Sequence, residues 1–139
     1  MLKAKDIMTK NVLIAKADTS FNDVVKVFTD SKIRHLPITN SNGILRAIIS
    51  SSDVLKAIHE MDQFAINYNG FSLEKRLEVD EEMSSDVVSV VDDLEIKEVI
   101  GLMLENDVHA LPVVNNNSVV GIITSNDILR AISKGEIVI

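Results

Sequence analysis

The sequence predicts an α+β fold in which two β-α-β-β-α repeats pack about a pseudo-two-fold axis. Three observations predict it: an internal repeat, apolar runs that alternate between strand and helix spacing, and Leu-Pro and Asp positions that recur in both copies. A single repeat of roughly 50 residues buries too little surface to form a stable fold alone. We therefore expect the two copies to form one module.

The internal repeat relates residues 8–58 to residues 83–132. When the first methionines of the two copies are superposed, one deletion in an asparagine-rich turn brings the rest into register, and fifteen positions are identical. The matched pairs include Met8 with Met83, Pro37 with Pro112, and Asp53 with Asp127. We place the first repeat at 1–60, a connecting segment at 61–80 and the second repeat at 81–139.

The first half of each copy predicts a strand followed by a helix. Short β-branched runs typical of buried strands occupy 12–14 and 87–91. Helix-start residues come next, at Asp18, Thr19 and Ser20 in one copy and at Asp92 and Asp93 in the other. Apolar residues then recur at helical spacing, at Phe21, Val24, Val25 and Phe28, and at Ile96, Val99, Ile100 and Met103.

The second half of each copy predicts two strands and a final helix. The Leu-Pro strands span 36–38 and 111–114, and asparagine-rich turns at 40–43 and 115–117 follow them. The next strands run over 44–49 and 119–123. The last helix begins at Ser50 in one copy and at Thr124 in the other.

The segment after the first copy has no counterpart after the second. We expect the preceding helix to continue into it and to end near Asn69 and Gly70. It carries three of the five aromatic residues, Phe64, Tyr68 and Phe71. These side chains either cover an edge of the module's own core or form a dimer contact or lid.

Composition excludes several classes of function. The net charge of −7 opposes binding to nucleic-acid backbones or anionic membranes. There is no cysteine, no apolar run long enough to span a membrane, and no signal-peptide pattern near Met1, so we expect a cytoplasmic protein. His35, His59 and His109 are scattered, and no catalytic or metal-binding motif is present. We therefore expect neither catalysis nor a metal site.

A hydroxyl lies three residues before a carboxylate at both final strand-to-helix junctions. The pairs are Ser50 with Asp53 and Thr124 with Asp127. One interpretation is a capping box, in which the two side chains satisfy backbone N–H groups of the first helical turn. The other is that the carboxylate accepts both hydroxyls of a ribose while the helix start receives a phosphate. Spacing alone leaves both interpretations open.

These motifs resemble those of the cystathionine-β-synthase (CBS) domain family. The resemblance rests on Met8-Thr9 and Met83-Ser84, on Ser89-Val90, on the segment 111–114 (LPVV), and on the segment 121–127 (GIITSND). It covers about 100 of the 139 residues. It implies a paired regulatory module that forms disc-shaped dimers and often binds AMP, ATP or S-adenosyl compounds in the cleft between copies.

The resemblance implies a stronger and a weaker ligand site. The stronger site comprises Ser89, Val90, His109, Pro112, Gly121, Thr124, Asp127 and Arg130. The weaker site comprises Ile14, Ala15, His35, Pro37, Ser50, Asp53 and Lys56. It is expected to bind less well because Ile14 replaces a hydroxyl of the family pattern and Ala47 replaces its glycine.

We therefore expect a non-enzymatic sensor that binds an adenosine-containing ligand such as AMP, ADP, ATP or S-adenosylmethionine. We also expect a homodimer, because the predicted helices carry many apolar residues, and an unidentified effector protein as a possible partner. The alternative is a structural dimerisation module whose ligand sites are empty.

Overall fold

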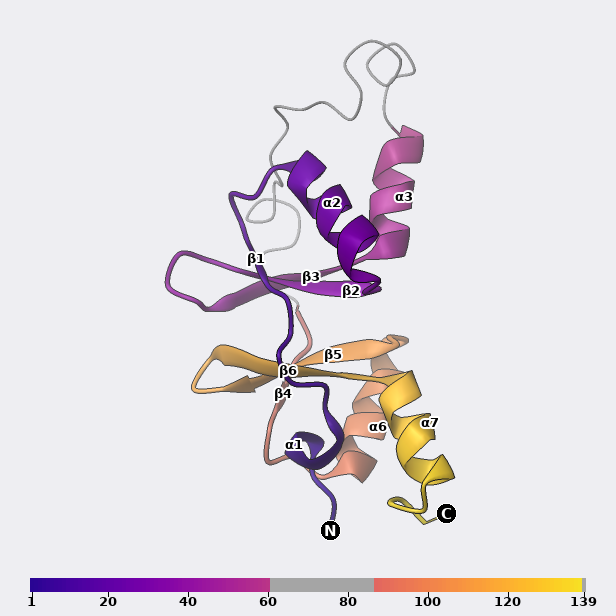
Figure 1. Ribbon diagram of the computed structural model, residues 1–139. Coiled ribbons are helices and arrows are strands. Elements are labelled where there is room, and N and C mark those ends of the chain that lie inside the picture. The colour runs from indigo at the N-terminus through magenta and orange to yellow at the C-terminus, as the bar shows by residue number, and fades with distance from the viewer. Residues whose placement is uncertain (61–86, 139) are drawn as a thin grey trace. The chain divides into compact units, whose positions relative to one another are not determined.

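A computed structural model describes residues 1–60 and 87–138, which fall into two compact units (Figure 1). The first-repeat unit comprises residues 13–87. The second-repeat unit comprises residues 88–139 together with residues 1–12. The N-terminal segment, residues 1–12, thus precedes the first repeat in sequence but packs with the second.

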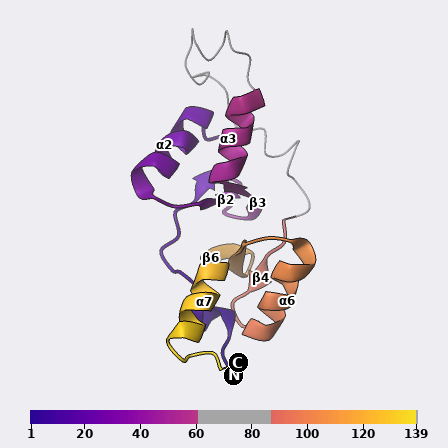
Figure 2. The same cartoon turned by 90° about the vertical axis from the view of Figure 1, so that its right-hand side faces the viewer.

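The first-repeat unit is a three-stranded sheet with two helices on one face (Figures 1 and 2). Strand β2 is central, parallel to β1 on one side and antiparallel to β3 on the other. The elements in chain order are β1 (Ala15–Lys16), α2 (Phe21–Ser31), β2 (His35–Thr39), β3 (Leu45–Ser50) and α3 (Ser51–Glu60). This order confirms the predicted β-α-β-β-α repeat.

The second-repeat unit has the same order and strand directions, with β5 central between parallel β4 and antiparallel β6. Its elements are β4 (Val90–Val91), α6 (Ile96–Asn106), β5 (Ala110–Asn115), β6 (Ser118–Thr124) and α7 (Ser125–Ser133). A short helix that the sequence pattern did not predict, α1 (Ala4–Ile7), joins this unit from the N-terminal segment. The two repeats therefore share one topology.

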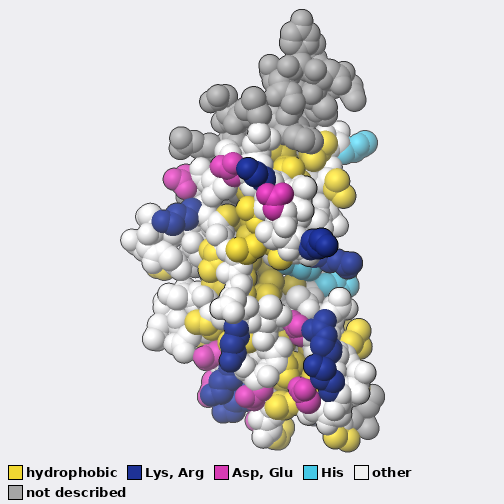
Figure 3. Space-filling view, viewed as in Figure 1, with side chains coloured by type: hydrophobic (Ala, Val, Ile, Leu, Met, Phe, Trp, Pro, Cys, Tyr) yellow, Lys and Arg dark blue, Asp and Glu magenta, His cyan; other side chains and the backbone are white. Residues whose placement is uncertain are grey.

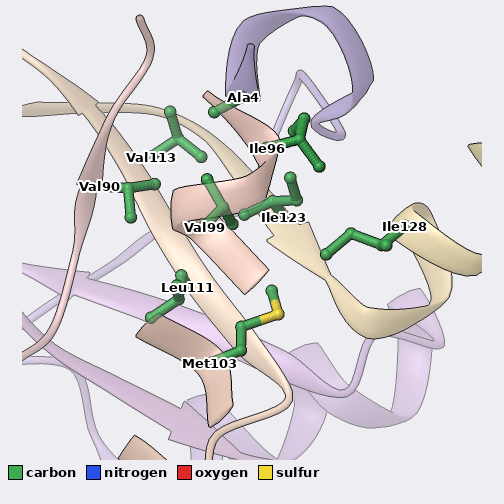
Figure 4. Close-up of a cluster of buried hydrophobic side chains, with 9 residues drawn as sticks. All are labelled: Ala4, Val90, Ile96, Val99, Met103, Leu111, Val113, Ile123 and Ile128. Atoms are coloured by element: carbon green, nitrogen blue, oxygen red, sulfur yellow. The ribbon is translucent and has the colours of Figure 1, made fainter. Parts of the chain in front are cut away.

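Each unit has its own apolar core between its sheet and its helices. In the second-repeat unit the buried residues come from α1, both long helices and all three strands (Figure 4): Ala4, Val90, Ile96, Val99, Met103, Leu111, Val113, Ile123 and Ile128. In the first-repeat unit they are Ala15, Phe21, Val24, Leu36, Ile38, Ala47, Ile49 and Val54. The apolar positions read at helical spacing are buried or half-buried in both helices, as predicted.

The start of α2 agrees with the sequence pattern, whereas the start of α6 does not. Ser20 caps α2, and its hydroxyl accepts a hydrogen bond from the backbone of Asp23 at 3.1 Å. The prediction that Asp92 and Asp93 begin the next helix is wrong, because the capping position of α6 is Glu95. The Asp93 carboxylate instead pairs with lysines of the N-terminal segment.

The predicted first strand is displaced in the first copy and shorter than predicted in the second. In the first copy the strand begins at Ala15, and Leu13 and Ile14 are 45% and 43% exposed. The boundary between the two units falls inside this apolar run, directly before Leu13. In the second copy only Val90 and Val91 pair with β5. Apolar character alone therefore misplaced the first strand and overestimated the length of the second.

The expectations for Phe64, Tyr68 and Phe71, and for a helix end near Asn69 and Gly70, concern residues outside the described part of the chain. Within the described residues, no helix combines the length and apolar character needed to cross a bilayer.

Candidate functional site

The candidate site lies where β6 ends and α7 begins. Thr124 is the capping residue of α7, and its hydroxyl accepts a hydrogen bond from the backbone N–H of Asp127 at 3.1 Å. In return, the backbone N–H of Thr124 donates to Asp127 Oδ2 at 2.9 Å. The sequence Thr-x-x-Asp thus forms the capping box that was one of its two interpretations. This pair of bonds fixes the carboxylate at the start of the helix.

Asp127 is the one buried charged residue in the described chain, with 7% of its surface exposed. A buried carboxylate needs hydrogen-bond donors to offset the loss of water. Besides the Thr124 N–H, Arg130 Nη1 donates a hydrogen bond to Asp127 Oδ1 at 3.3 Å. The Thr9 hydroxyl also donates to it, 3.2 Å from Oδ1 and 3.4 Å from Oδ2. The carboxylate is therefore held from three directions.

Thr9 reaches Asp127 because the N-terminal segment pairs with β6. The backbone N–H of Thr9 donates to the Ile122 carbonyl at 2.8 Å, and the Ile122 N–H donates to the Thr9 carbonyl at 3.0 Å. Gly121 permits this approach. A Cβ at that position would lie 2.5 Å from Met8 Sδ and 2.9 Å from the Thr9 carbonyl oxygen. The glycine therefore admits the N-terminal segment rather than leaving space for a ligand.

Ion pairs and backbone hydrogen bonds anchor the other end of the N-terminal segment. Lys3 Nζ and Lys5 Nζ each lie 3.0 Å from Asp93 Oδ1, and the backbone N–H of Ala4 donates to the Leu94 carbonyl at 2.8 Å. These lysines hold the pKa of the Asp93 carboxyl below its ordinary value. The hydrogen bond and charge of Asp93 raise the pKa of Lys5.

Basic and acidic side chains mix over the face of this unit that carries α1 and α7 (Figure 3). Because the side chains of Lys3, Lys5 and Asp93 are exposed, water and salt weaken the ion pairs between them.

The equivalent junction in the first-repeat unit forms a simpler capping box. The Ser50 N–H donates to Asp53 Oδ2 at 2.8 Å, and the Asp53 N–H donates to the Ser50 hydroxyl at 3.0 Å. Unlike Asp127, Asp53 is exposed. The repeat alignment places Ser84 as the counterpart of Thr9, and Ser84 lies outside the described residues. The two junctions thus share the cap but differ in carboxylate burial.

The first backbone N–H group of each final helix is already bonded. The Ser125 N–H donates to the His109 carbonyl at 2.9 Å, and the Ser51 N–H donates to the Arg34 carbonyl at 2.9 Å. The N–H groups of Asp127 and Asp53 are bonded to the capping hydroxyls. Two of the four N–H groups that a helix start leaves free are therefore unavailable to a phosphate at each junction. The exposed side chain of Arg130, on α7, is an alternative donor.

The structure brings together three of the eight residues predicted for the stronger site, Thr124, Asp127 and Arg130. His109 is exposed directly before β5, Ser89 is half-buried, and Pro112 is fully buried. Val90 belongs to the apolar core, so its side chain packs against other core residues and is not available to a ligand.

The residues predicted for the weaker site differ widely in exposure. Ser50 and Asp53 are hydrogen-bonded to each other, as described above. Ala15 and Pro37 are buried, His35 is half-buried, and Ile14 and Lys56 are exposed.

Sequence reasoning missed Thr9 as a site residue. The sequence does carry a signal for it, because Met8-Thr9 is the opening motif of the first repeat. Its partner, however, lies 118 residues away in the other repeat. Among the described residues no group of acidic and histidine side chains is placed to hold a metal ion, and no buried side-chain polar atom lacks a partner.

The fold and this junction define a tandem-repeat module with one topology used twice. The sequence profile of the CBS domain matches residues 4–60 and again residues 78–134. The chain therefore belongs to the CBS domain family and carries two copies of the domain.

The relatives place this pair in several protein contexts. The chain is 32% identical over 127 residues to an uncharacterised protein of Methanocaldococcus jannaschii, MJ1225, matching 90% of this chain and 45% of that protein. It is 32% identical over 129 residues to the inosine-5′-monophosphate dehydrogenase of the same organism, matching 92% of this chain and 23% of the enzyme. The chain thus spans less than half of either relative, and its likeness to the enzyme covers only the CBS part.

One similar solved structure is the CBS domain pair of protein MJ0100, in complex with 5′-methylthioadenosine and S-adenosyl-L-methionine. It has a TM-score of 0.76 and 29% identity, and covers 97% of this chain and 98% of its own. Two three-stranded sheets with helices, repeated in tandem, are thus the architecture of CBS domain pairs.

Proposed function

We propose that this chain is a regulatory module whose second-repeat unit binds an adenosine-containing ligand through Asp127. The observation that carries the proposal is a buried carboxylate held at the start of α7, beside an exposed arginine. The module senses the ligand and does not transform it. This differs from the dehydrogenase relative, whose similarity to the chain is confined to the CBS part.

The chemistry of a ribose suits this carboxylate. Two oxygens offer about four acceptor positions, and Thr124 and Arg130 each use one of them. Thr9 shares its single proton between both oxygens. About one acceptor position thus remains for a ribose hydroxyl while all three donors are in place. A hydrogen bond to an ionised group is stronger than one between neutral groups.

Arg130 is the candidate phosphate partner. Its side chain is 60% exposed and its contact with Asp127 is long, at 3.3 Å. A guanidinium with several N–H groups is able to keep one carboxylate contact and still donate to a phosphate. His109 supplies a second exposed side chain directly before β5, and its backbone carbonyl is bonded to the first residue of α7. An S-adenosyl compound would need neither group for a phosphate.

The base would be contacted chiefly by backbone atoms near Ser89 and Val90. The Val90 side chain packs in the core, which leaves only its main chain for a ligand. The similar CBS domain pair of MJ0100 was solved in complex with 5′-methylthioadenosine and S-adenosyl-L-methionine, and this supports adenosine as the shared part of the ligand. In this proposal Gly121 acts indirectly, because it admits the segment that carries Thr9.

The Asp53 site is proposed to bind the same ligand class more weakly. Asp53 is exposed, so its carboxylate interacts with a ligand through water of high dielectric constant. Ile14, at the position aligned with Ser89, offers no hydroxyl, and it is 43% exposed.

We also propose that the chain forms a homodimer. Leu55 on α3 and Leu129 on α7 occupy equivalent positions of the two repeats, and they are 67% and 61% exposed. The recurrence of an exposed leucine at the same place in both copies supports a contact surface on these two helices. A second copy of the chain is the proposed occupant, acting in the cytoplasm alongside an effector protein that reads the ligand state.

A structural dimerisation module with empty sites is the second candidate. The observation that favours it is the complete capping box at both junctions, which gives each carboxylate a role without any ligand.

A thermal-shift panel separates the two candidates. It comprises AMP, ADP, ATP, 5′-methylthioadenosine, S-adenosylmethionine and NAD, with guanosine monophosphate as the matched control. A ligand that binds only the folded state raises the midpoint as its concentration increases. The regulatory proposal predicts such a rise for at least one adenosine compound and none for the guanosine control. No rise with any adenosine compound up to millimolar concentration would favour the structural module.

A further inference from the structure

We infer that Thr9 is a positioning residue for the adenosine site, holding the Asp127 carboxylate in the orientation that receives a ribose. This inference rests on the proposed function. It assigns the N-terminal segment a part in ligand binding, although that segment precedes the other repeat in sequence. The contact that carries it is the hydroxyl-to-carboxylate hydrogen bond at 3.2 Å.

Thr9 is the more rigid of the two side-chain donors to Asp127. Both of its backbone polar groups are bonded to Ile122, at 2.8 and 3.0 Å, so its Cα position is fixed against β6. The hydroxyl then has one side-chain torsion, and the β-branched chain restricts it. Arg130, in contrast, has a long side chain that is 60% exposed. A rigid donor limits the rotation of the carboxylate, whereas a flexible one follows it.

The Asp127 carboxylate is already oriented before the ligand binds. The Thr124 N–H holds Oδ2, and the Thr9 hydroxyl lies between Oδ2 and Oδ1. A carboxylate already fixed in orientation loses less conformational entropy when it accepts a ribose hydroxyl. Without the Thr9 proton, the group would be held by Thr124 at one oxygen and by the exposed Arg130 at the other.

Gly121 allows the N-terminal segment to approach β6 closely enough for Thr9 to reach Asp127. Its missing side chain leaves room for Met8 and for the Thr9 carbonyl, which a Cβ would meet at 2.5 and 2.9 Å. In the first repeat the aligned residue is Ala47, whose Cβ is present. The two repeats therefore do not offer the same surface to an incoming segment, and this difference accompanies the difference in carboxylate burial.

The test uses calorimetric titration of the full chain with AMP and with 2′,3′-dideoxy-AMP, or with the matching pair built on whichever adenosine compound binds most tightly. Thr9→Val keeps the shape of the side chain and removes the hydroxyl, while Thr9→Ser keeps the hydroxyl. We expect Thr9→Val to weaken AMP binding about three- to tenfold. We expect Thr9→Ser to remain within about twofold of wild type, since the donor is retained.

The dideoxy compound distinguishes positioning from a general effect on the fold. Without ribose hydroxyls the ligand makes no use of the carboxylate orientation, so Thr9→Val should cost no additional affinity for 2′,3′-dideoxy-AMP. Lys5→Met is the matched control, because it removes an ion pair of the same segment but does not touch Asp127. It should leave AMP affinity unchanged.

Three results would overturn the inference while leaving the proposed function intact. They are unchanged AMP affinity in Thr9→Val, an equal loss for both ligands, and an equal loss in Lys5→Met. If the wild-type chain binds none of the adenosine compounds, the proposed function fails and the role of Thr9 fails with it. Unfolding curves for each variant establish that the titrated protein is folded.

Discussion

The Thr9 hydroxyl lies 3.2 Å from a carboxylate oxygen of Asp127, and the two residues are 118 positions apart in the chain. The opening motif of the first repeat therefore contacts the closing motif of the second, inside a single packed unit. The approach of the N-terminal segment that allows this contact requires a glycine on β6, because a Cβ at Gly121 would meet Met8 and the Thr9 carbonyl.

Gly121→Ala should destabilise the fold. The added methyl group would meet Met8 Sδ and the Thr9 carbonyl at distances shorter than van der Waals contact. Overpacking of this kind costs about 1–3 kcal/mol in the free energy of unfolding. Urea denaturation measures the difference. Gly101→Ala is the matched control, because it lies in α6 with no atom near its Cβ position and should stabilise the helix by up to about 1 kcal/mol.

The two capping boxes should differ in their contribution to stability. Asp127→Ala removes the acceptor for the Thr124 N–H, Thr9 and Arg130 at a buried site, and we expect a loss of about 1–3 kcal/mol. Asp53→Ala removes one exposed backbone contact, for which about 0.5–1 kcal/mol is expected. Denaturant unfolding of both variants under identical conditions compares them. A larger loss from Asp53→Ala would show that burial does not set the difference.

The Asp93 ion pairs should depend on pH in a defined direction. The pKa of Asp93 is lowered from 3.8, so its contribution to stability is present above that value and disappears as pH falls through the lower folded pKa. The pKa of Lys5 is raised from 10.5, so its contribution is present below that value and is lost as pH rises through the higher folded pKa. Between these limits the contribution is constant.

NMR titration of the Asp93 carboxyl carbon tests this directly. The midpoint should lie below 3.8 in the wild type and move upward in Lys3→Met and in Lys5→Met, because each substitution removes one cation from the carboxylate. High salt should reduce the difference, since both partners are exposed. A midpoint that does not respond to either substitution would mean that the lysines do not pair with Asp93 in solution.

Leu55→Asp and Leu129→Asp should each shift the proposed homodimer toward the 15.3 kDa monomer. A charge placed in an apolar contact is left without a partner when the interface forms. Light scattering at a series of protein concentrations measures the mass. Leu104→Asp is the control, because Leu104 is 77% exposed but its aligned position in the first repeat is the polar Thr29. A wild-type chain that is already monomeric at micromolar concentration would contradict the dimer.

Local sequence signals predicted the repeats well because each β-α-β-β-α unit follows from residues close together in the chain. The helical spacing of Phe21 and Val24 and the cap at Ser20 are local, and both are confirmed. The N-terminal segment was not predictable in this way. Its partners, Asp93 and Ile122, lie in the other repeat, and nothing in the spacing of residues 1–12 specifies which repeat they join.

The candidate site was predicted in part for the same reason. Thr124 and Asp127 are three residues apart, so their pairing follows from helix geometry. The burial of Asp127 and the exposure of Asp53 do not follow from it, because the two sequences around these residues are nearly alike. Burial depends on the surrounding packed unit, where Thr9 arrives from a distant part of the chain.

Calorimetric titration of Asp127→Ala and Asp53→Ala with the tightest-binding adenosine compound tests the central claim most directly. Loss of the charge-assisted hydrogen bond to the ribose should weaken binding to Asp127→Ala about tenfold or more, measured for the folded fraction. Asp53→Ala should change the affinity less. An Asp127→Ala variant that binds as tightly as the wild type would contradict the account, and it would leave Asp127 with the capping role alone.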